Sequence, residues 1–193
     1  MMRGYMIALA HRSTTTGEAS RSAPSSKMQF ELQMLDYASG RQHRICRGVW
    51  SAELHNICDM LDAALIQLAF LEEVQHGPQS AARLRQLSEQ GGFGTLLSAY
   101  TDSKSIWSYL KANHLKTPAE KGTFYHLAFV QETLNRWLSE FSWIDTRDMV
   151  ADALTKGKLD RLPLQKFMQG HWQLEHQLAT IAKGKDSQLG APS

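Results

Sequence analysis

Apolar side chains change their spacing several times along the chain, and each spacing predicts a different element. The apolar run at residues 5–10 and the partly alternating run at residues 30–38 indicate two strands. Residues 13–27 between them are rich in Ser, Thr, Gly and Pro, which predicts a loop. From residue 51 to residue 75, leucine and isoleucine recur every three or four positions, so this segment is expected to form a long amphipathic helix.

The second half of the chain alternates between helical and strand patterns. Residues 96–101 are predicted to form a strand that runs directly into Asp102, and residues 141–144 another. Pro118 suits the start of a longer helix, because proline lacks the N–H that the first turn leaves unpaired. The predicted helices of this half cover residues 79–90, 103–112, 118–138, 149–156 and 160–183.

This order of elements predicts a mixed α/β fold. Two strands open the chain, and a helix, a strand, helices, a strand and a helix follow. Strands joined by a hairpin are antiparallel, whereas strands joined through a helix are usually parallel. We therefore expect a mixed sheet flanked by helices in one domain over residues 1–158, followed by a helical or disordered tail over residues 159–193.

Composition limits the class of protein and the compartment in which we expect it. Hydrophobic residues make up 42% of the chain, enough for a packed core, and no apolar run is long enough to cross a membrane. The apolar segment near Tyr5 is too short for a signal peptide, and no small-residue cleavage site follows it. Cys46 and Cys58 form no Cys-x-x-Cys pair, which argues for reduced thiols and against a thiolate zinc site. The sequence thus predicts an intracellular protein, of cytoplasm or nucleus, without a membrane partner.

Charge is unevenly distributed, although the whole chain carries a net charge of only +2. Residues 51–102 contain seven Asp or Glu and two Lys or Arg, a balance of −5, whereas the segments on either side are basic. The basic stretch before the long helix contains Arg41, Arg44 and Arg47. These guanidinium groups are candidates for contact with nucleic-acid phosphates, and a solvated basic turn explains them equally well.

Three acidic residues stand out by their positions in the predicted elements. Glu53 lies in the first turn of the long helix, Asp102 at the end of a strand, and Asp152 in a short helix. Carboxylates at strand ends and helix starts can converge at one edge of a sheet and bind Mg²⁺, or Mn²⁺ in its place. Each also has a simpler explanation: Glu53 would favour the helix dipole, Asp102 would cap the next helix, and Asp152 would be a solvated acid.

Short motifs around these acids resemble the ribonuclease H domain at the end of copia-type retrotransposon polyproteins. Thr-Asp-Ser-Lys-Ser at residues 101–105 resembles the strand end of that family, and Ala-Asp-Ala-Leu-Thr-Lys at residues 151–156 matches its helix motif. Ser-Ala-Glu-Leu at residues 51–54 resembles its helix start, which follows a similar basic stretch. The resemblance extends roughly over residues 4–158.

The resemblance implies a catalytic site, a substrate and partners. The family binds two Mg²⁺ ions with four carboxylates and hydrolyses the RNA strand of RNA–DNA hybrids during reverse transcription. Glu53, Asp102 and Asp152 match the second, third and fourth of these catalytic and metal-binding carboxylates. The implied partners are an RNA–DNA hybrid and the reverse transcriptase portion of the parent polyprotein.

The sequence departs from the family pattern at its start. The first carboxylate of the family belongs to a strand just before the position of Gly4, and the 193 residues contain no Asp before Asp36. That strand is central in the resembled fold, between the second strand and the strand that ends at Asp102. Its absence removes a hydrogen-bonded neighbour on both sides and one metal ligand. We therefore expect weak or no nuclease activity, or else a non-catalytic nucleic-acid-binding or structural remnant.

A second departure lies just before the Asp152 motif. Met149 and Val150 stand where the family commonly has an Asn followed by a hydrophobic residue, and residues 145–148 contain no histidine that would assist product release. His171 and His176 are expected on the surface of the tail.

Overall fold

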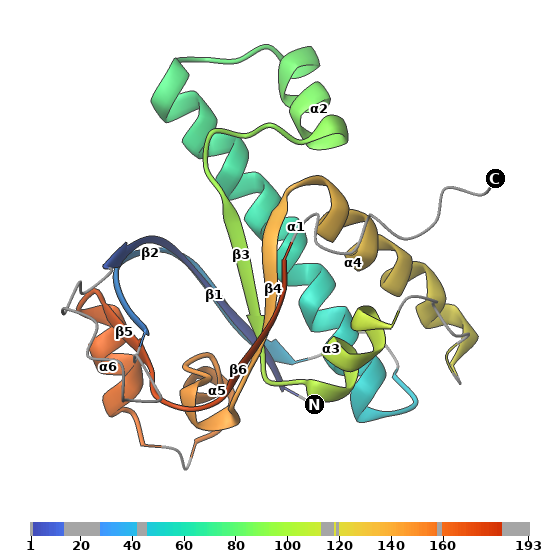
Figure 1. Ribbon diagram of the computed structural model, residues 1–193, viewed down its shortest axis with the longest axis vertical. Coiled ribbons are helices and arrows are strands. Elements are labelled where there is room, and N and C mark those ends of the chain that lie inside the picture. Colours follow the sequence, from blue (N-terminus) through green and yellow to red (C-terminus); the bar gives the residue numbers. More distant parts are fainter. Residues whose placement is uncertain are drawn as a thin grey trace, which may run out of the picture. The chain divides into compact units, whose positions relative to one another are not determined.

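The chain folds into two compact units in a computed structural model, which describes residues 2–13, 28–41, 46–112, 118, 120–157 and 160–182. Unit 1 comprises Met1–Gln42 and Ile144–Leu178, and unit 2 comprises His43–Trp143 and Ala179–Ser193. Each is built around a three-stranded sheet (Figure 1). The predicted mixed α/β class is confirmed, and two small sheets take the place of the single mixed sheet we expected.

Unit 1 is a long β-hairpin to which a third strand and two short helices are added. β1 (Met2–Ser13) and β2 (Met28–Arg41) pair antiparallel. β5 (His171–Leu174) pairs antiparallel with the start of β2, which gives the strand order β1-β2-β5. α5 (Asp152–Thr155) packs on both hairpin strands, and α6 (Leu162–Met168) packs on β2 and β5.

Aromatic rings connect the added elements of unit 1 to its hairpin. Phe30 of β2 stacks on Trp172 of β5 with ring centroids 5.2 Å apart, and Phe167 of α6 meets the same indole edge-on at 6.2 Å. Phe30 and Phe167 are both buried. Since aromatic pairs at these separations stabilise beyond the area they bury, the three rings hold α6 and β5 on the hairpin.

Unit 2 has the strand order β3-β4-β6. β3 (Leu97–Thr101) and β4 (Leu138–Ile144) are parallel, and β6 (Leu178–Ala182) lies on the other side of β4. A hydrogen bond of 2.8 Å between the hydroxyls of Ser142 and Thr180 joins β4 to β6. The antiparallel hairpin of unit 1 and this parallel pair agree with the strand directions predicted from the connections.

Helices connect and cover the strands of unit 2. α1 (Val49–His76) packs against α3, α4 and β3 (Figure 1). None of the helices among the described residues is long and apolar enough to span a bilayer. The other helical segments of this unit are α2 (Ala81–Gln90), α3 (Lys104–Lys111), the 3-10 turn η1 (Lys121–Thr123) and α4 (Phe124–Arg136).

The core of unit 2 forms where α1 meets α3, α4 and β4. The side chains of Leu54 and Leu61 in α1, which recur at helical spacing, are completely buried. Burial of this apolar stripe stabilises the helix far more than its intrinsic propensity does. The completely buried partners in the same cluster are Ile106, Leu127, Val130, Leu138 and Phe141.

α1 begins two residues earlier than the sequence predicts. Gly48 is the N-cap residue, and Ser51 is a buried residue of the first turn whose hydroxyl donates to the Gly48 carbonyl oxygen at 3.0 Å. The first turn therefore contains no acidic residue, and Glu53 belongs to the second turn.

Two predicted helices are wrong in part. The helix expected from Pro118 begins at Lys121 and ends at Arg136, because Leu138 already belongs to β4. The helix expected over residues 160–183 is wrong after α6, because two strands follow. Gly170 adopts a φ of 92°, which favours glycine and ends the helix. The residues that follow form β5, which pairs with β2, and β6, which pairs with β4.

Candidate functional site

Asp102 follows directly on β3, where the backbone turns into α3. The turn is held by the buried Thr101, whose hydroxyl oxygen accepts a hydrogen bond from the N–H of Ser103 at 3.1 Å. Ser103 is the N-cap residue of α3, and its carbonyl oxygen accepts a helical hydrogen bond from Trp107 N at 3.1 Å. Asp102 itself is half-buried. Its predicted position at a strand end is confirmed.

The end of β4 fixes the backbone of Asp102 through Trp143. Trp143 lies opposite Thr101 in the parallel ladder, and its indole N–H donates to the Asp102 carbonyl oxygen at 3.0 Å. Lys104 Nζ lies 4.8 Å from the centre of the Trp143 ring, within the range of a cation–π interaction. Both strands of the parallel pair therefore position the segment that carries Asp102.

Glu53 offers a carboxylate without a partner. It is half-buried, between the buried residues Ala52 and Leu54. No hydrogen bond or ion pair joins its side chain to the rest of the described chain. The helix dipole acts mainly within the first turn, so it does not explain an acid in the second turn. Glu53 is thus available to a ligand.

Asp152 is the first residue of α5 and is paired with a lysine of its own motif. One Asp152 carboxylate oxygen forms an ion pair with Lys156 Nζ, and the Lys156 N–H donates to the Asp152 carbonyl oxygen at 2.8 Å. The Asp152 side chain is 16% exposed. A metal ion at Asp152 would therefore have to compete with Lys156, a partner that the sequence did not reveal.

The three acids are distributed over both units. Glu53 and Asp102 belong to unit 2, and Asp152 belongs to unit 1. Within the described ranges, no three His, Cys, Asp or Glu side chains form a group that could hold a metal ion. Carboxylate oxygens are nevertheless the donors that Mg²⁺ prefers. A metal site on these acids stays a prediction from the sequence.

The proposed phosphate contacts lie around the start of α1. Arg41 is the last residue of β2, and Arg47 is an exposed residue in the bend before α1. Arg44 lies outside the described residues. An exposed guanidinium at Arg47 is compatible with a phosphate contact and with simple solvation.

Cysteines and histidines pair near the start of α1. Cys46 Sγ lies 3.3 Å from His55 Nδ1, and the thiol of Cys58 donates to the His126 carbonyl oxygen at 3.7 Å. The rings of His55 and His126 meet edge-on with centroids 4.3 Å apart. Neither Cys46 nor Cys58 forms a disulfide within the described residues. These contacts connect α1 to α4, and they do not amount to a metal-binding group.

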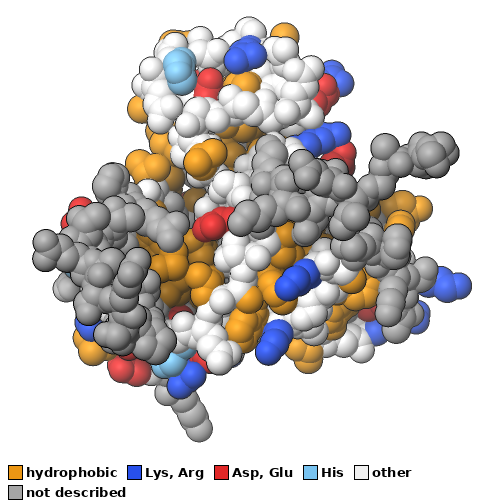
Figure 2. Space-filling model, in the orientation of Figure 1, with side chains coloured by type: hydrophobic (Ala, Val, Ile, Leu, Met, Phe, Trp, Pro, Cys, Tyr) orange, Lys and Arg blue, Asp and Glu red, His pale blue; other side chains and the backbone are white. Residues whose placement is uncertain are grey.

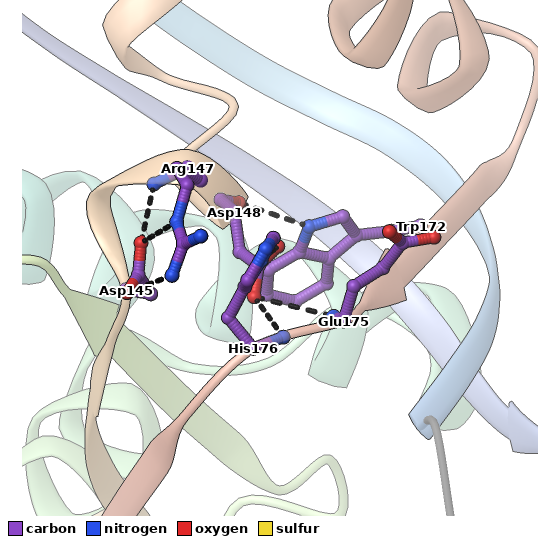
Figure 3. A network of polar contacts seen from close by, with 6 residues as sticks. All are labelled: Asp145, Arg147, Asp148, Trp172, Glu175 and His176. Carbon is purple, nitrogen blue, oxygen red and sulfur yellow. Dashed lines mark hydrogen bonds and ion pairs between the residues drawn. The ribbon is translucent and has the colours of Figure 1, made fainter.

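A polar network in unit 1 centres on Asp148, the last residue of the 3-10 turn η2 (Thr146–Asp148) (Figure 3). The Asp148 side chain is 4% exposed, and its Oδ2 accepts hydrogen bonds from the backbone N–H groups of Glu175 at 3.2 Å and His176 at 2.9 Å. His176 Nδ1 lies 2.8 Å from Asp148 Oδ1. The buried carboxylate thus holds the turn between β5 and β6 and leaves the His176 ring partly exposed.

Asp145 forms the second half of this network. It is the N-cap residue of η2, and Arg147 donates to its carboxylate from Nε at 2.8 Å, from a second guanidinium nitrogen at 2.9 Å and from the backbone N–H at 3.0 Å. The side-chain hydrogen bonds of Arg147 hold the pKa of Asp145 well below its usual range. The three hydrogen bonds from Arg147 thus favour the ionised form of Asp145.

The sequence did not reveal the pairing of Asp148 with His176. His176 is exposed, as predicted for the tail, and residues 145–148 themselves contain no histidine. The structure brings a histidine to that segment from 28 positions further along the chain. The contact forms because the turn after β5 brings His176 to Asp148, and no local pattern in the sequence predicts it.

Comparison with known proteins identifies no relative, since no family model, curated protein or solved structure matches this chain. A function must therefore be argued from the residues and elements described above.

Proposed function

We propose that this chain is a retrotransposon-derived ribonuclease H-like domain that binds RNA–DNA hybrids and cleaves their RNA strand slowly or not at all. Glu53, Asp102 and Asp152 are the proposed catalytic carboxylates, with Mg²⁺ or Mn²⁺ as cofactor and a reverse transcriptase as the natural partner. When bound, two such ions activate a water molecule and stabilise the leaving oxygen. Three of the family's four carboxylates have counterparts among the 193 residues, and one of these, Asp152, is already paired with Lys156.

The placement of Asp102 carries the proposal. Its Thr-Asp-Ser-Lys-Ser motif joins β3 to α3, and β3 is parallel to β4 after a helical connection. In open sheets of this kind, ligands bind beyond the carboxyl ends of the strands. A half-buried carboxylate at this end, with its backbone fixed by Trp143, suits a role in binding rather than in folding alone.

A cleavage assay on a labelled RNA–DNA hybrid tests the proposal directly. The full chain is incubated with the hybrid in Mg²⁺ or Mn²⁺, and RNA fragments are separated on a gel. We expect slow cleavage that requires the metal and is lost in Asp102→Asn. Asp36→Asn is the matched control, because Asp36 lies in β2 and the motif does not use it.

Each outcome bears on a different part of the proposal. Cleavage that persists in Asp102→Asn would show that another site or a contaminant acts. Cleavage of duplex DNA at the same rate would remove the hybrid as the substrate. Absence of cleavage together with hybrid binding in a gel-shift assay would favour the second candidate function below.

The second candidate is a non-catalytic remnant that binds nucleic acid or serves only as a structural part of a polyprotein. The ion pair between Asp152 and Lys156 favours it, because this lysine neutralises one of the three proposed ligands. Hybrid binding would then depend on phosphate contacts such as Arg47. A chain that neither cleaves nor shifts the hybrid would overturn both nucleic-acid functions.

A further inference from the structure

Two lysines and a serine lie on one exposed face of α3, the helix that begins two residues after Asp102. Lys104, Ser108 and Lys111 are all exposed. At about 100° of rotation per residue, their side chains fall within roughly 60° of one another around the helix axis. We call these three residues the α3 row. The buried residues of α3 occupy the rest of its circumference: Ile106, Trp107 and Leu110.

Each lysine of the α3 row is held by a tryptophan and not by a carboxylate. Lys104 Nζ lies 4.8 Å from the centre of the Trp143 ring, and Lys111 Nζ lies 5.0 Å from the centre of the Trp107 ring. Neither lysine forms an ion pair with another residue of the described chain. The face of an aromatic ring attracts an ammonium group without neutralising its charge. Both positive charges therefore remain available to an anion.

The local charge changes sign at the start of α3. Residues 51–102 contain seven Asp or Glu and two Lys or Arg, whereas residues 103–119 contain three Lys and no Asp or Glu. Arg85 and Arg136 of the same unit form ion pairs with acids one turn away on their own helices. Figure 2 shows blue side chains at the surface in the region that Figure 1 labels α3. The α3 row is thus a cationic surface directly after an acidic segment.

The α3 row begins beside the proposed catalytic Asp102. Trp143, whose ring contacts Lys104, also donates its indole N–H to the Asp102 carbonyl oxygen at 3.0 Å. Lys104 and Lys111 are seven residues apart, which corresponds to about 10 Å along a helix axis. One strand of a duplex carries a phosphate about every 3.4 Å of its axis, so the row has the length of roughly three nucleotides. A strand that follows the row therefore ends near Asp102.

We propose that the α3 row binds the sugar–phosphate backbone of one strand of a nucleic acid. Lys104 and Lys111 contact phosphates through their ammonium groups, and the Ser108 hydroxyl donates to a phosphate oxygen between them. Phosphate contacts position a strand without reading its base sequence. Packing of the lysine stems on indole rings orders both side chains before binding, which lowers the entropic cost of the contact. The inference rests on the proposed function, because hybrid binding supplies the polyanion.

Fluorescence anisotropy with the full chain and a labelled RNA–DNA hybrid, repeated at several salt concentrations, tests the proposal. The metal is omitted so that the hybrid stays intact. We expect Lys104→Met and Lys111→Met each to weaken binding of hybrids of any sequence and to reduce the slope of log Kd against log salt by about 1. Methionine keeps an unbranched apolar side chain against the indole. Lys104→Arg, which retains the charge and the ring contact, should keep the wild-type slope.

Arg85→Met is the matched control, because it removes one exposed positive charge of the same unit at a residue that is paired with Glu89. Equal slopes for wild type and both methionine variants of the row would overturn the proposal and leave hybrid binding itself intact. An equal loss in Arg85→Met would also overturn it, since net charge alone would then explain binding. A wild-type chain that binds no hybrid would overturn the proposed function as well. Far-ultraviolet circular dichroism checks that each variant is folded.

Discussion

Asp145 illustrates how a single residue can be held in one ionisation state by its neighbour. Three hydrogen bonds from Arg147 reach its carboxylate, and they lower its pKa. We expect Arg147→Met to raise the pKa of Asp145 toward the ordinary value of an Asp. The chemical shift of the Asp145 carboxyl carbon, followed by NMR as pH falls, measures this change.

The sign of the corresponding stability effect follows from the direction of that shift. A carboxyl whose pKa is lower in the folded state stabilises the fold above its unfolded-state pKa, and this contribution is lost as pH falls through the folded-state pKa. The advantage of wild type over Arg147→Met should therefore be largest near neutral pH and shrink as the pH falls into the acid range. Arg85→Met is a suitable control, because Arg85 pairs with Glu89 in another unit. An unchanged pKa in Arg147→Met would contradict the assignment.

For Asp148 we predict a larger effect on the free energy of unfolding, because its carboxylate is buried. Asp148→Ala leaves the backbone N–H groups of Glu175 and His176, and the His176 ring, without their acceptor. Buried donors without partners cost about 1–3 kcal/mol each, so we expect a loss of about 2–4 kcal/mol in the free energy of unfolding. Urea denaturation measures it. Glu31→Ala, at an exposed acidic residue of the same unit, should cost less than about 1 kcal/mol.

At the scale of elements, two glycines that end helices provide a matched pair. Gly77 after α1 and Gly91 after α2 both have positive φ, at 79° and 75°. An added Cβ meets nothing within 4 Å at Gly77, but it would lie 2.5 Å from the Arg136 carbonyl oxygen at Gly91. The end of α2 therefore requires glycine for both its conformation and its packing against the end of α4.

Substitution by alanine should separate these two requirements. Gly77→Ala carries only the backbone strain, about 1–3 kcal/mol. Gly91→Ala adds the steric overlap with Arg136, and overpacking typically costs about 1–3 kcal/mol more. Thermal or urea unfolding of both variants gives the comparison. Equal destabilisation of the two variants would show that the backbone at the end of α4 can shift to accommodate the added Cβ without a loss of stability.

Elements with strong local patterns were predictable from the sequence, and elements that depend on distant pairing were not. α1 was predictable because its buried leucines recur at helical spacing, and β3 because an apolar run ends at Asp102. The residues of β5 carry no comparable pattern, and they form a strand because they pair with β2, far earlier in the chain. The same applies to the candidate site: the motif positions of Asp102 and Asp152 were predictable, whereas the partners Trp143 and His176 required the fold.

At the scale of the whole molecule, the division into two units predicts which amides lose protection from exchange when one contact is removed. All the partners of Asp148 belong to unit 1. In Asp148→Ala, amide hydrogen exchange should therefore accelerate in β5 and in the turn after it, while the amides of α1 in unit 2 keep their protection. Mass spectrometry of peptic fragments measures both regions. Equal acceleration in α1 would show that the two units open together.

The proposed metal dependence also belongs to the whole molecule, because it involves acids of both units. A ligand that binds only the folded state stabilises it by RT ln(1 + [L]/Kd), about 1.4 kcal/mol at a free concentration ten times Kd. We expect millimolar Mn²⁺ to raise the melting temperature of wild type, and Asp102→Asn and Asp152→Asn each to reduce this shift. Asp36→Asn should keep it. If Asp152→Asn alone retains the full shift, the ion pair with Lys156 is the whole role of Asp152, and the metal ligands must be sought in unit 2.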